Sequence, residues 1–194
     1  MDETGHLQEG EVYCFVQTEE GGQLVTGDVV VTRCPALHPG DVQCVKAVDV
    51  PADSPLSALH NVVVFSSMGE RDLPSQLSGG DLDGDLYNII YDNTLYPRRL
   101  ARPADYPAAT PLDIGRAVER SDMTDFFISF MENDNLGLIA TLHQILADQR
   151  VLGTFDPHCL LLANLHSTAV DFSKTGIPVS IDNCHTASRT LLTP

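Results

Sequence analysis

The first half of the chain alternates short apolar runs with clusters of Gly, Pro, Asp and Ser. Such runs, rich in β-branched residues and bounded by turn-forming residues, are typical of β-strands. The pattern predicts five strands, at residues 11–17, 24–33, 41–50, 61–67 and 85–92. Breaks are predicted at residues 20–22, 35–40, 51–55 and 75–80. Strands this short and closely spaced indicate an all-β sandwich or barrel.

The predicted strand at residues 41–50 also indicates which side chains are buried. Successive side chains of a strand point to opposite faces of the sheet, so alternate residues share a face. Val45 and Ala47 share one face with Gln43 and Asp49. The other face is the more apolar, and we expect it to be buried, with the lysine stem packed and its ammonium in water. This face carries Val42, Cys44, Lys46 and Val48.

The pattern changes twice in the second half of the chain. Residues 96–111 hold four prolines and three arginines, which predicts a linker or surface crossover. From residue 112, apolar residues recur every three to four positions, as in amphipathic helices. Three helices are predicted. The first is capped by Ser121 or Asp122 and the second by a residue of 133–135, while the third is capped by Asp156 and runs to Val170. We therefore expect an α+β protein with a β module (1–95), a linker (96–111) and a helical module (112–194).

Charge narrows the possible functions. The 194 residues carry a net charge of −16, and 43% of them are hydrophobic, enough for a buried core. The negative charge argues against a free-standing nucleic-acid binder, which gathers Lys and Arg, and against an electrostatic membrane anchor. It is compatible with the binding of hard cations, or with a chain whose basic surface lies elsewhere.

Other features of the sequence indicate a soluble protein of the cytoplasm or nucleus. The five cysteines are odd in number and include no C-x-x-C pair, which favours reduced thiols over a disulfide framework. The acidic N-terminus is unlike a signal peptide. Every apolar run is shorter than the roughly 18–20 residues that a membrane span needs. We therefore expect no membrane partner.

One segment combines three aspartates with glycines. Asp81, Asp83 and Asp85 are spaced at i, i+2 and i+4, which on an extended or tightly turning backbone directs their carboxylates to one side. Without a cation such carboxylates repel one another, and Mg²⁺ removes that conflict. Phosphoryl or nucleotidyl transfer with two metal ions uses such a cluster. The adjacent Gly79, Gly80 and Gly84 leave room for a close-approaching backbone or substrate.

Three other interpretations of this segment remain open at this point. An EF-hand loop would match the aspartate spacing, but it places glycine where this chain has Leu86, and helices should flank it. A glycine-rich calcium-binding nonapeptide would start at Gly79-Gly80, but such turns occur in tandem arrays. Asp and Gly are also common in surface turns without function.

The order of motifs around the aspartates resembles a known family. The chain contains, in sequence, VVVTRCP at 29–35, HPGDV at 38–42, VVFSS at 63–67, GER at 69–71 and SGGDLDGD at 78–85. This order is similar to the catalytic region of the eukaryotic cellular RNA-dependent RNA polymerases, the enzymes of RNA silencing. Asp81, Asp83 and Asp85 match the three aspartates of that family's signature. Residues 163–176 resemble the family's helical region downstream, so the likeness spans about residues 12–178.

The resemblance implies a fold and an activity. The β module would resemble the second of the family's two double-psi β-barrels, followed by the helical module. The activity would be template-directed addition of ribonucleotides to RNA, with ribonucleoside triphosphates as substrates. Asp81, Asp83 and Asp85 would be the catalytic residues and the ligands of Mg²⁺. RNA template and product would be the partners.

The length of the chain departs from that family. Its enzymes are several times longer and place the active centre between two barrels, whereas this sequence holds the strands of one. We therefore expect a partial chain whose partner is the remainder of a longer polymerase. The alternative is a non-catalytic, truncated relic that acts as an interaction module.

Three basic residues are candidates for substrate binding. Arg33 and Arg71 lie near the ends of predicted strands that flank the aspartates, and the guanidinium fork suits phosphate oxygens. An ion pair with one of the 27 acidic residues is the alternative for either arginine. Lys174 falls within the helical resemblance, where it either reaches the cleft or pairs locally with Asp171.

Overall fold

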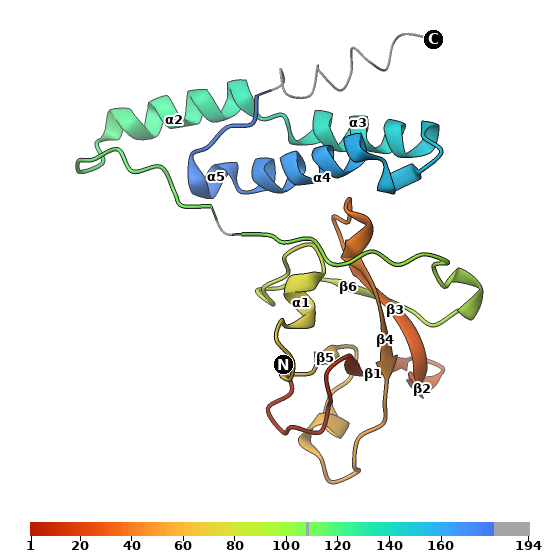
Figure 1. Ribbon diagram of the computed structural model, residues 1–194. Coiled ribbons are helices and arrows are strands. Elements are labelled where there is room, and N and C mark those ends of the chain that lie inside the picture. The colour runs from red at the N-terminus through yellow and green to blue at the C-terminus, as the bar shows by residue number, and fades with distance from the viewer. Residues whose placement is uncertain (108, 181–194) are drawn as a thin grey trace. The chain divides into compact units, whose positions relative to one another are not determined.

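The computed structural model describes residues 1–107 and 109–180 of the chain. The chain divides into two compact units, one from Met1 to Tyr106 and one that begins at Pro107. We call them the β unit and the helical unit (Figure 1). The protein is therefore α+β, with the strands preceding the long helices, as the sequence predicts.

The β unit is built on one curled sheet (Figure 1). Its strands in the described residues are β1 (Glu11–Thr18), β2 (Gly21–Leu24), β3 (Gly27–Arg33), β4 (Val42–Ala47), β5 (Val63–Phe65) and β6 (Tyr87–Ile90). They are ordered β2-β1-β4-β3-β6, with β5 also paired to β1. The β1–β4 pairing is parallel and the others are antiparallel.

The five predicted strands are all present, and β2 is an additional one. The sequence predicts a break at residues 20–22, but Gly21 pairs with Thr18 and starts the second arm of a hairpin. Gly21 adopts a φ of +139°, which glycine allows without strain. The glycine pair that predicts a break therefore forms the first two residues of β2.

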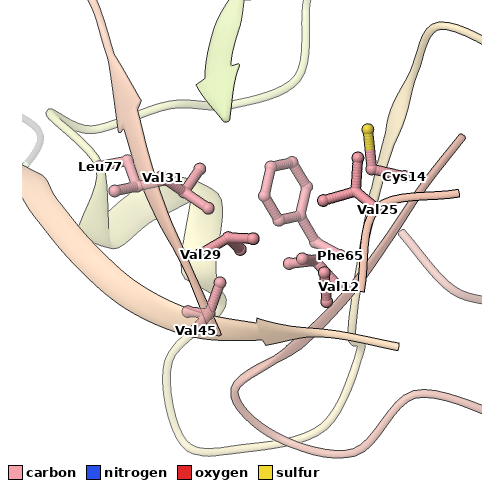
Figure 2. Close-up of a cluster of buried hydrophobic side chains, with 9 residues drawn as sticks. Val12, Cys14, Val25, Val29, Val31, Val45, Phe65 and Leu77 are labelled. Carbon is pink, nitrogen blue, oxygen red and sulfur yellow. The ribbon is translucent and has the colours of Figure 1, made fainter. Parts of the chain in front are cut away.

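A cluster of valines around Phe65 forms the main core of the β unit. Figure 2 shows the Phe65 ring among the valines of several strands. The ring also contacts Tyr87 edge-on, with ring centroids 4.8 Å apart. The buried members of the cluster are Val12, Cys14, Val25, Val29, Val31, Val45, Ala47, Phe65 and Leu77. On the other side of β1 and β5, a second cluster buries Leu7, Tyr13, Val50, Leu56 and Val64.

The prediction of which face of β4 is buried is wrong. Val45 and Ala47 are buried, whereas Lys46 is exposed. The neighbouring strands explain the difference, because Val45 pairs with the fully buried Val29 and must share its face. Lys46 instead pairs with acidic residues on both neighbouring strands, Glu11 and Asp28. The residues that β4 pairs with therefore decide which of its faces is buried, more than the number of apolar residues on each face.

Short helical turns lie between the longer elements. The four-residue helix α1 (Leu73–Gln76) lies where the sequence predicts part of a break. Its first turn is capped by Asp72, whose carboxylate accepts a hydrogen bond from the Ser75 amide at 2.8 Å. The single 3₁₀ turns of the described residues are Pro39–Asp41, Pro55–Ala58, Asn93–Leu95 and Gly153–Phe155.

The helical unit contains the three predicted helices and a short fourth. They are α2 (Arg120–Asn133), α3 (Leu136–Gln149), α4 (Pro157–Val170) and α5 (Phe172–Thr175). Helices α3 and α4 pack against each other over a core that includes Ile139, Leu146, Cys159 and Leu162. No helix of the described residues is long and apolar enough to span a membrane.

The predicted N-caps are confirmed for α3, which begins after Asn135, and for α4, whereas the N-cap of α2 is shifted. Asp156 caps α4 as predicted, since its carboxylate accepts a hydrogen bond from the His158 amide at 2.9 Å. For α2 the N-cap is Glu119, not Ser121 or Asp122. The carboxylate of Asp122 accepts a hydrogen bond from the Glu119 amide at 2.8 Å, which completes a capping box. Asp122, one of the two residues predicted to cap this helix, therefore lies within its first turn.

Candidate metal centre

The loop between α1 and β6 brings the three aspartates together. Asp81, Asp83 and Asp85 each offer one carboxylate oxygen, and these oxygens lie within 4.8 Å of one another. Asp81 and Asp83 are exposed, whereas the Asp85 side chain is only 7% exposed. The three carboxylates therefore converge as their spacing predicts, but in two different environments.

The loop needs glycine at particular positions. Gly79 and Gly84 adopt φ angles of +67° and +128°, a region that side chains disfavour. Gly80 is crowded instead, because a Cβ there would lie 2.5 Å from the Tyr87 hydroxyl and 2.9 Å from the Pro74 carbonyl oxygen. Glycines therefore let the chain turn sharply and pass close to α1 and β6.

Asp85 closes the loop on itself. Its Oδ2 accepts hydrogen bonds from the backbone amides of Asp81 and Leu82, at 3.1 and 3.3 Å. The Tyr87 hydroxyl donates to the same oxygen at 3.4 Å. Asp85 thus orders the backbone that carries the other two carboxylates.

Arg33 holds the same loop from the sheet. It is the last residue of β3 and pairs with Tyr87, the first residue of β6. Its Nε lies 2.6 Å from Asp85 Oδ1, and its Nη1 donates to the Ser78 carbonyl oxygen at 3.0 Å. One guanidinium therefore joins the two ends of the loop, and its contact with Asp85 is the ion pair that was the alternative to substrate binding for Arg33.

These contacts determine the charge state of the loop. Burial alone would raise the pKa of Asp85, but the Arg33 guanidinium and the hydrogen bonds from the amides of Asp81 and Leu82 bring that pKa below its ordinary value. Burial and the nearby Asp85 charge raise the pKa of Tyr87 to about 12. At neutral pH Asp85 is therefore an anion, and Tyr87 keeps the proton that it donates.

The donor set fits a hard divalent cation. Three carboxylates are the ligands that Mg²⁺ prefers, at about 2.0–2.1 Å, so two oxygens on one ion can be at most about 4.2 Å apart. The observed separations of up to 4.8 Å need only a small rotation of the exposed Asp81 and Asp83 side chains. An EF-hand is not supported, because the strand β6 follows the loop where that motif has a helix.

The other two candidate substrate-binding residues make local contacts of their own. Arg71 donates to the carbonyl oxygen and hydroxyl of Ser75, at 2.6 and 3.2 Å, and so ties down α1. Its Nη1 also lies 3.5 Å from the Asp105 carboxylate. Lys174 belongs to the helical unit, where its ammonium lies 3.9 Å from Asp171. Substrate contact by either residue stays a prediction.

Tyr87 and Tyr106 are site residues that the sequence analysis missed. Tyr87 lies two residues after Asp85, so alternation along the strand was a usable signal for it. Tyr106 packs against Gly79, and its hydroxyl donates to the buried Asp41. No sequence signal singled out Tyr106, which falls within the predicted linker at 96–111. Tyr106 therefore brings the predicted linker against the start of the aspartate loop.

Comparison with known proteins shows which family this chain matches in sequence. The family model described as RNA dependent RNA polymerase matches residues 1–193. The Probable RNA-dependent RNA polymerase 2 of Oryza sativa subsp. japonica is 39% identical over 197 residues, which cover 93% of this chain and 17% of the relative. RNA-dependent RNA polymerase 6 of Arabidopsis thaliana is 39% identical over 202 residues, covering 93% and 16%.

The structural comparison agrees with the sequence match. The RNA dependent RNA polymerase QDE-1 from Thielavia terrestris superposes with a TM-score of 0.72 at 25% sequence identity. The match covers 100% of this chain and 23% of that one. The chain therefore spans about a sixth of the length of the two plant relatives and about a quarter of the solved structure.

Proposed function

The chain belongs to the RNA-dependent RNA polymerase family, and we propose that it carries the catalytic metal site of a silencing-type enzyme of that family. The observation that carries this proposal is the convergence of Asp81, Asp83 and Asp85 on one loop. The family match indicates the class of reaction, and the loop provides three carboxylates that can bind the metal ions for it. The non-catalytic interaction module is not favoured, because the matched relatives are named as polymerases.

The proposed reaction is transfer of a ribonucleotide to the 3′ end of an RNA. The 3′ hydroxyl releases its proton to solvent and its oxygen forms a bond to the α-phosphorus of a ribonucleoside triphosphate, while the bond from that phosphorus to the leaving pyrophosphate breaks. Bound Mg²⁺ would lower the pKa of the attacking hydroxyl and neutralise charge on the pyrophosphate. Asp81 and Asp83 would supply the exposed oxygens that hold the metal, and Asp85 the anchored third.

Charge supports a longer polymerase as the working unit. RNA template, RNA product and triphosphates are all anionic, whereas this chain has 27 acidic and 11 basic residues. Metal ions at the aspartate loop offset part of the repulsion locally. We propose that basic residues in the remainder of a longer chain hold the RNA.

We extend the proposal to the fold of the β unit and to its cellular setting. A curled sheet that mixes one parallel pairing, β1–β4, with antiparallel ones supports the double-psi barrel that the resemblance implies. Cys14, Cys34, Cys44 and Cys159 are free thiols, which supports a cytoplasmic or nuclear location. Cys184 lies outside the described residues.

The test is an exchange of one aspartate in the complete chain that carries these residues. Asp83→Ala removes an exposed carboxylate, whereas the hydrogen bonds that close the loop end on Asp85. We expect Mg²⁺-dependent incorporation of ribonucleotides on an RNA template to fall by roughly a thousandfold or more. The thermal unfolding temperature should not change.

Asp53→Ala is the matched control, because it removes the same charge from an exposed position outside the loop. It should incorporate nucleotides at the wild-type rate. Chelation of divalent ions should stop incorporation by the wild-type chain, and added Mg²⁺ should restore it. Incorporation by Asp83→Ala at the wild-type rate would refute the proposed role of the loop.

A further inference from the structure

We propose that Arg33 is a positioning residue, whose guanidinium fork fixes Asp85 and thereby sets the affinity of the aspartate loop for a divalent cation. This inference rests on the proposed function, since it assumes that the loop holds the metal. It differs from the sequence expectation that Arg33 contacts substrate phosphate. In this role Arg33 touches neither metal nor nucleotide and acts through Asp85.

The first support is that Arg33 contacts both ends of the loop at once. Nε lies 2.6 Å from Asp85 Oδ1, and Nη1 donates to the carbonyl oxygen of Ser78 at 3.0 Å. Ser78 directly precedes the glycines, and Asp85 is the last of the three aspartates. The guanidinium therefore sets the distance across which the loop must close.

The second support is the difference in freedom among the three carboxylates. Asp81 and Asp83 are exposed and can rotate toward a cation. Asp85 cannot rotate in the same way, because its Oδ1 faces Arg33 and its Oδ2 accepts the amides of Asp81 and Leu82. A ligand set with one fixed member needs less ordering on metal binding than one with three free members.

The third support is that the position of Arg33 is itself tightly constrained. Its place at the end of β3 is held by pairing with Tyr87. Its side chain is 19% exposed, and a Cβ on Gly80 would lie 3.1 Å from its Cδ. The arginine stem therefore has a defined route past the glycine to the carboxylate.

Arg33→Lys separates geometry from charge. Lysine keeps the positive charge beside Asp85, but it is a point charge without the fixed fork that reaches Asp85 and Ser78 together. The matched control is Arg116→Lys, because Arg116 likewise pairs with an aspartate, donating to both carboxylate oxygens of Asp122 at 2.6 and 2.7 Å. That pair belongs to the helical unit, whereas the aspartate loop belongs to the β unit.

The direct measurement is Mn²⁺ binding to the complete chain, followed by the loss of the free-ion electron paramagnetic resonance signal. Binding that persists in Asp83→Ala is subtracted, because an acidic protein attracts Mn²⁺ elsewhere. We expect Arg33→Lys to weaken the Asp83-dependent binding about tenfold or more, as loss of a metal ligand's supporting partner does. Arg116→Lys should stay within about twofold of wild type, as expected for an exposed ion pair.

A double variant tests whether Arg33 acts through Asp85. With Asp85→Asn already in place, adding Arg33→Lys should change Mn²⁺ affinity by no more than about twofold. An effect as large as in the wild-type background would overturn the proposal. So would wild-type Mn²⁺ affinity in Arg33→Lys. An Arg33→Lys chain that no longer unfolds cooperatively on heating would also overturn it, since Arg33 would then be needed for the fold.

Nucleotide incorporation distinguishes positioning from substrate binding. Positioning predicts that Arg33→Lys raises the Mg²⁺ concentration for half-maximal rate, with the nucleotide KM at saturating Mg²⁺ within about twofold of wild type. A raised nucleotide KM with an unchanged Mg²⁺ curve would assign Arg33 to the substrate and overturn the proposal.

The two proposals can fail separately. If Arg33→Lys weakens Mn²⁺ binding but the wild-type chain incorporates no nucleotide, the proposed function fails and the positioning role stands. If Asp83→Ala abolishes incorporation while Arg33→Lys leaves Mn²⁺ binding unchanged, the positioning role fails and the proposed function stands.

Discussion

The β unit and helix α2 bury their aromatic side chains to very different extents. Phe65 of β5 is 1% exposed and lies at the centre of a closed valine core (Figure 2). Helix α2 contains no buried residue, and its Phe127 is 63% exposed. Phe126 and Phe130 of α2 are partly covered through ring contacts with Phe172 of α5.

This difference shows that the β unit buries its core with its own strands and can hold a functional site in a fixed geometry. Strands of the β unit that are distant in sequence pair with one another and bury both sides of β1 and β5. That pairing places Arg33 against a loop 45 residues away. The aspartate loop thus lies on the better-packed part of the molecule, where a fixed geometry is easiest to maintain.

The largest expected effect tests the contrast in burial directly. Phe65→Ala should lower the free energy of unfolding of the β unit by about 3–5 kcal/mol, because it leaves a cavity in the core. Phe127→Ala should change stability by less than about 0.5 kcal/mol. Urea unfolding followed by circular dichroism measures both. Comparable losses would show that Phe127 is covered in solution and would remove the contrast.

Acid should weaken the β unit through Asp2. Burial would raise the pKa of this carboxylate, but hydrogen bonds from Thr4 and the Leu7 amide lower the pKa from 3.8 to about 2. The folded state then binds the proton less tightly than the unfolded state, so the stabilisation is present above pH 4. It should be lost as the pH falls from about 4 to 2, and it amounts to about 2 kcal/mol.

Urea unfolding at pH 7 and pH 3 measures this effect, and Asp2→Asn is the comparison variant. The variant should be less stable than wild type at pH 7 and should lose less stability on acidification. Identical pH dependence in the two proteins would contradict the assignment to Asp2. Other carboxylates with lowered pKa values, Asp85 among them, contribute to the dependence that remains.

A methyl group at Gly80 should disturb the aspartate loop. The added Cβ would lie 2.9 Å from the Pro74 carbonyl oxygen, a backbone atom that cannot turn away, so Gly80→Ala should cost about 1–2 kcal/mol. Mn²⁺ binding should weaken as well, because the loop must shift. Thermal unfolding and Mn²⁺ titration of this variant check the two effects. Unchanged values in both would show that the loop tolerates displacement.

The smallest expected effect has the opposite sign and lies in the helical unit. Gly137 is in the first turn of α3, with open space where a Cβ would be. Gly137→Ala should stabilise the helical unit by about 0.5 kcal/mol, because alanine has the higher helix propensity. A rise in its thermal unfolding temperature would show this. A fall would indicate that another group occupies that space.

Local patterns predicted most of the longer elements of both units, but not the short helices α1 and α5. Alternating and β-branched runs predicted β1, β3, β4, β5 and β6, and the 3.6-residue period predicted α2, α3 and α4. The spacing of Asp81, Asp83 and Asp85 predicted convergence, because side-chain direction along a short loop depends on adjacent residues. Only β2, whose glycine pair was interpreted as a break, was missed among the strands of the described residues.

The sequence by itself therefore determined the α+β class, the order of the elements and the aspartate cluster, since each depends on residues within one element. Tertiary structure decided which face of β4 is buried, that Arg33 pairs with Asp85, and that Asp85 differs from Asp81 and Asp83. These features depend on strand register between distant segments. Any of the 27 acidic residues could have formed the ion pair with Arg33, and the register of the folded sheet brings Asp85 to it.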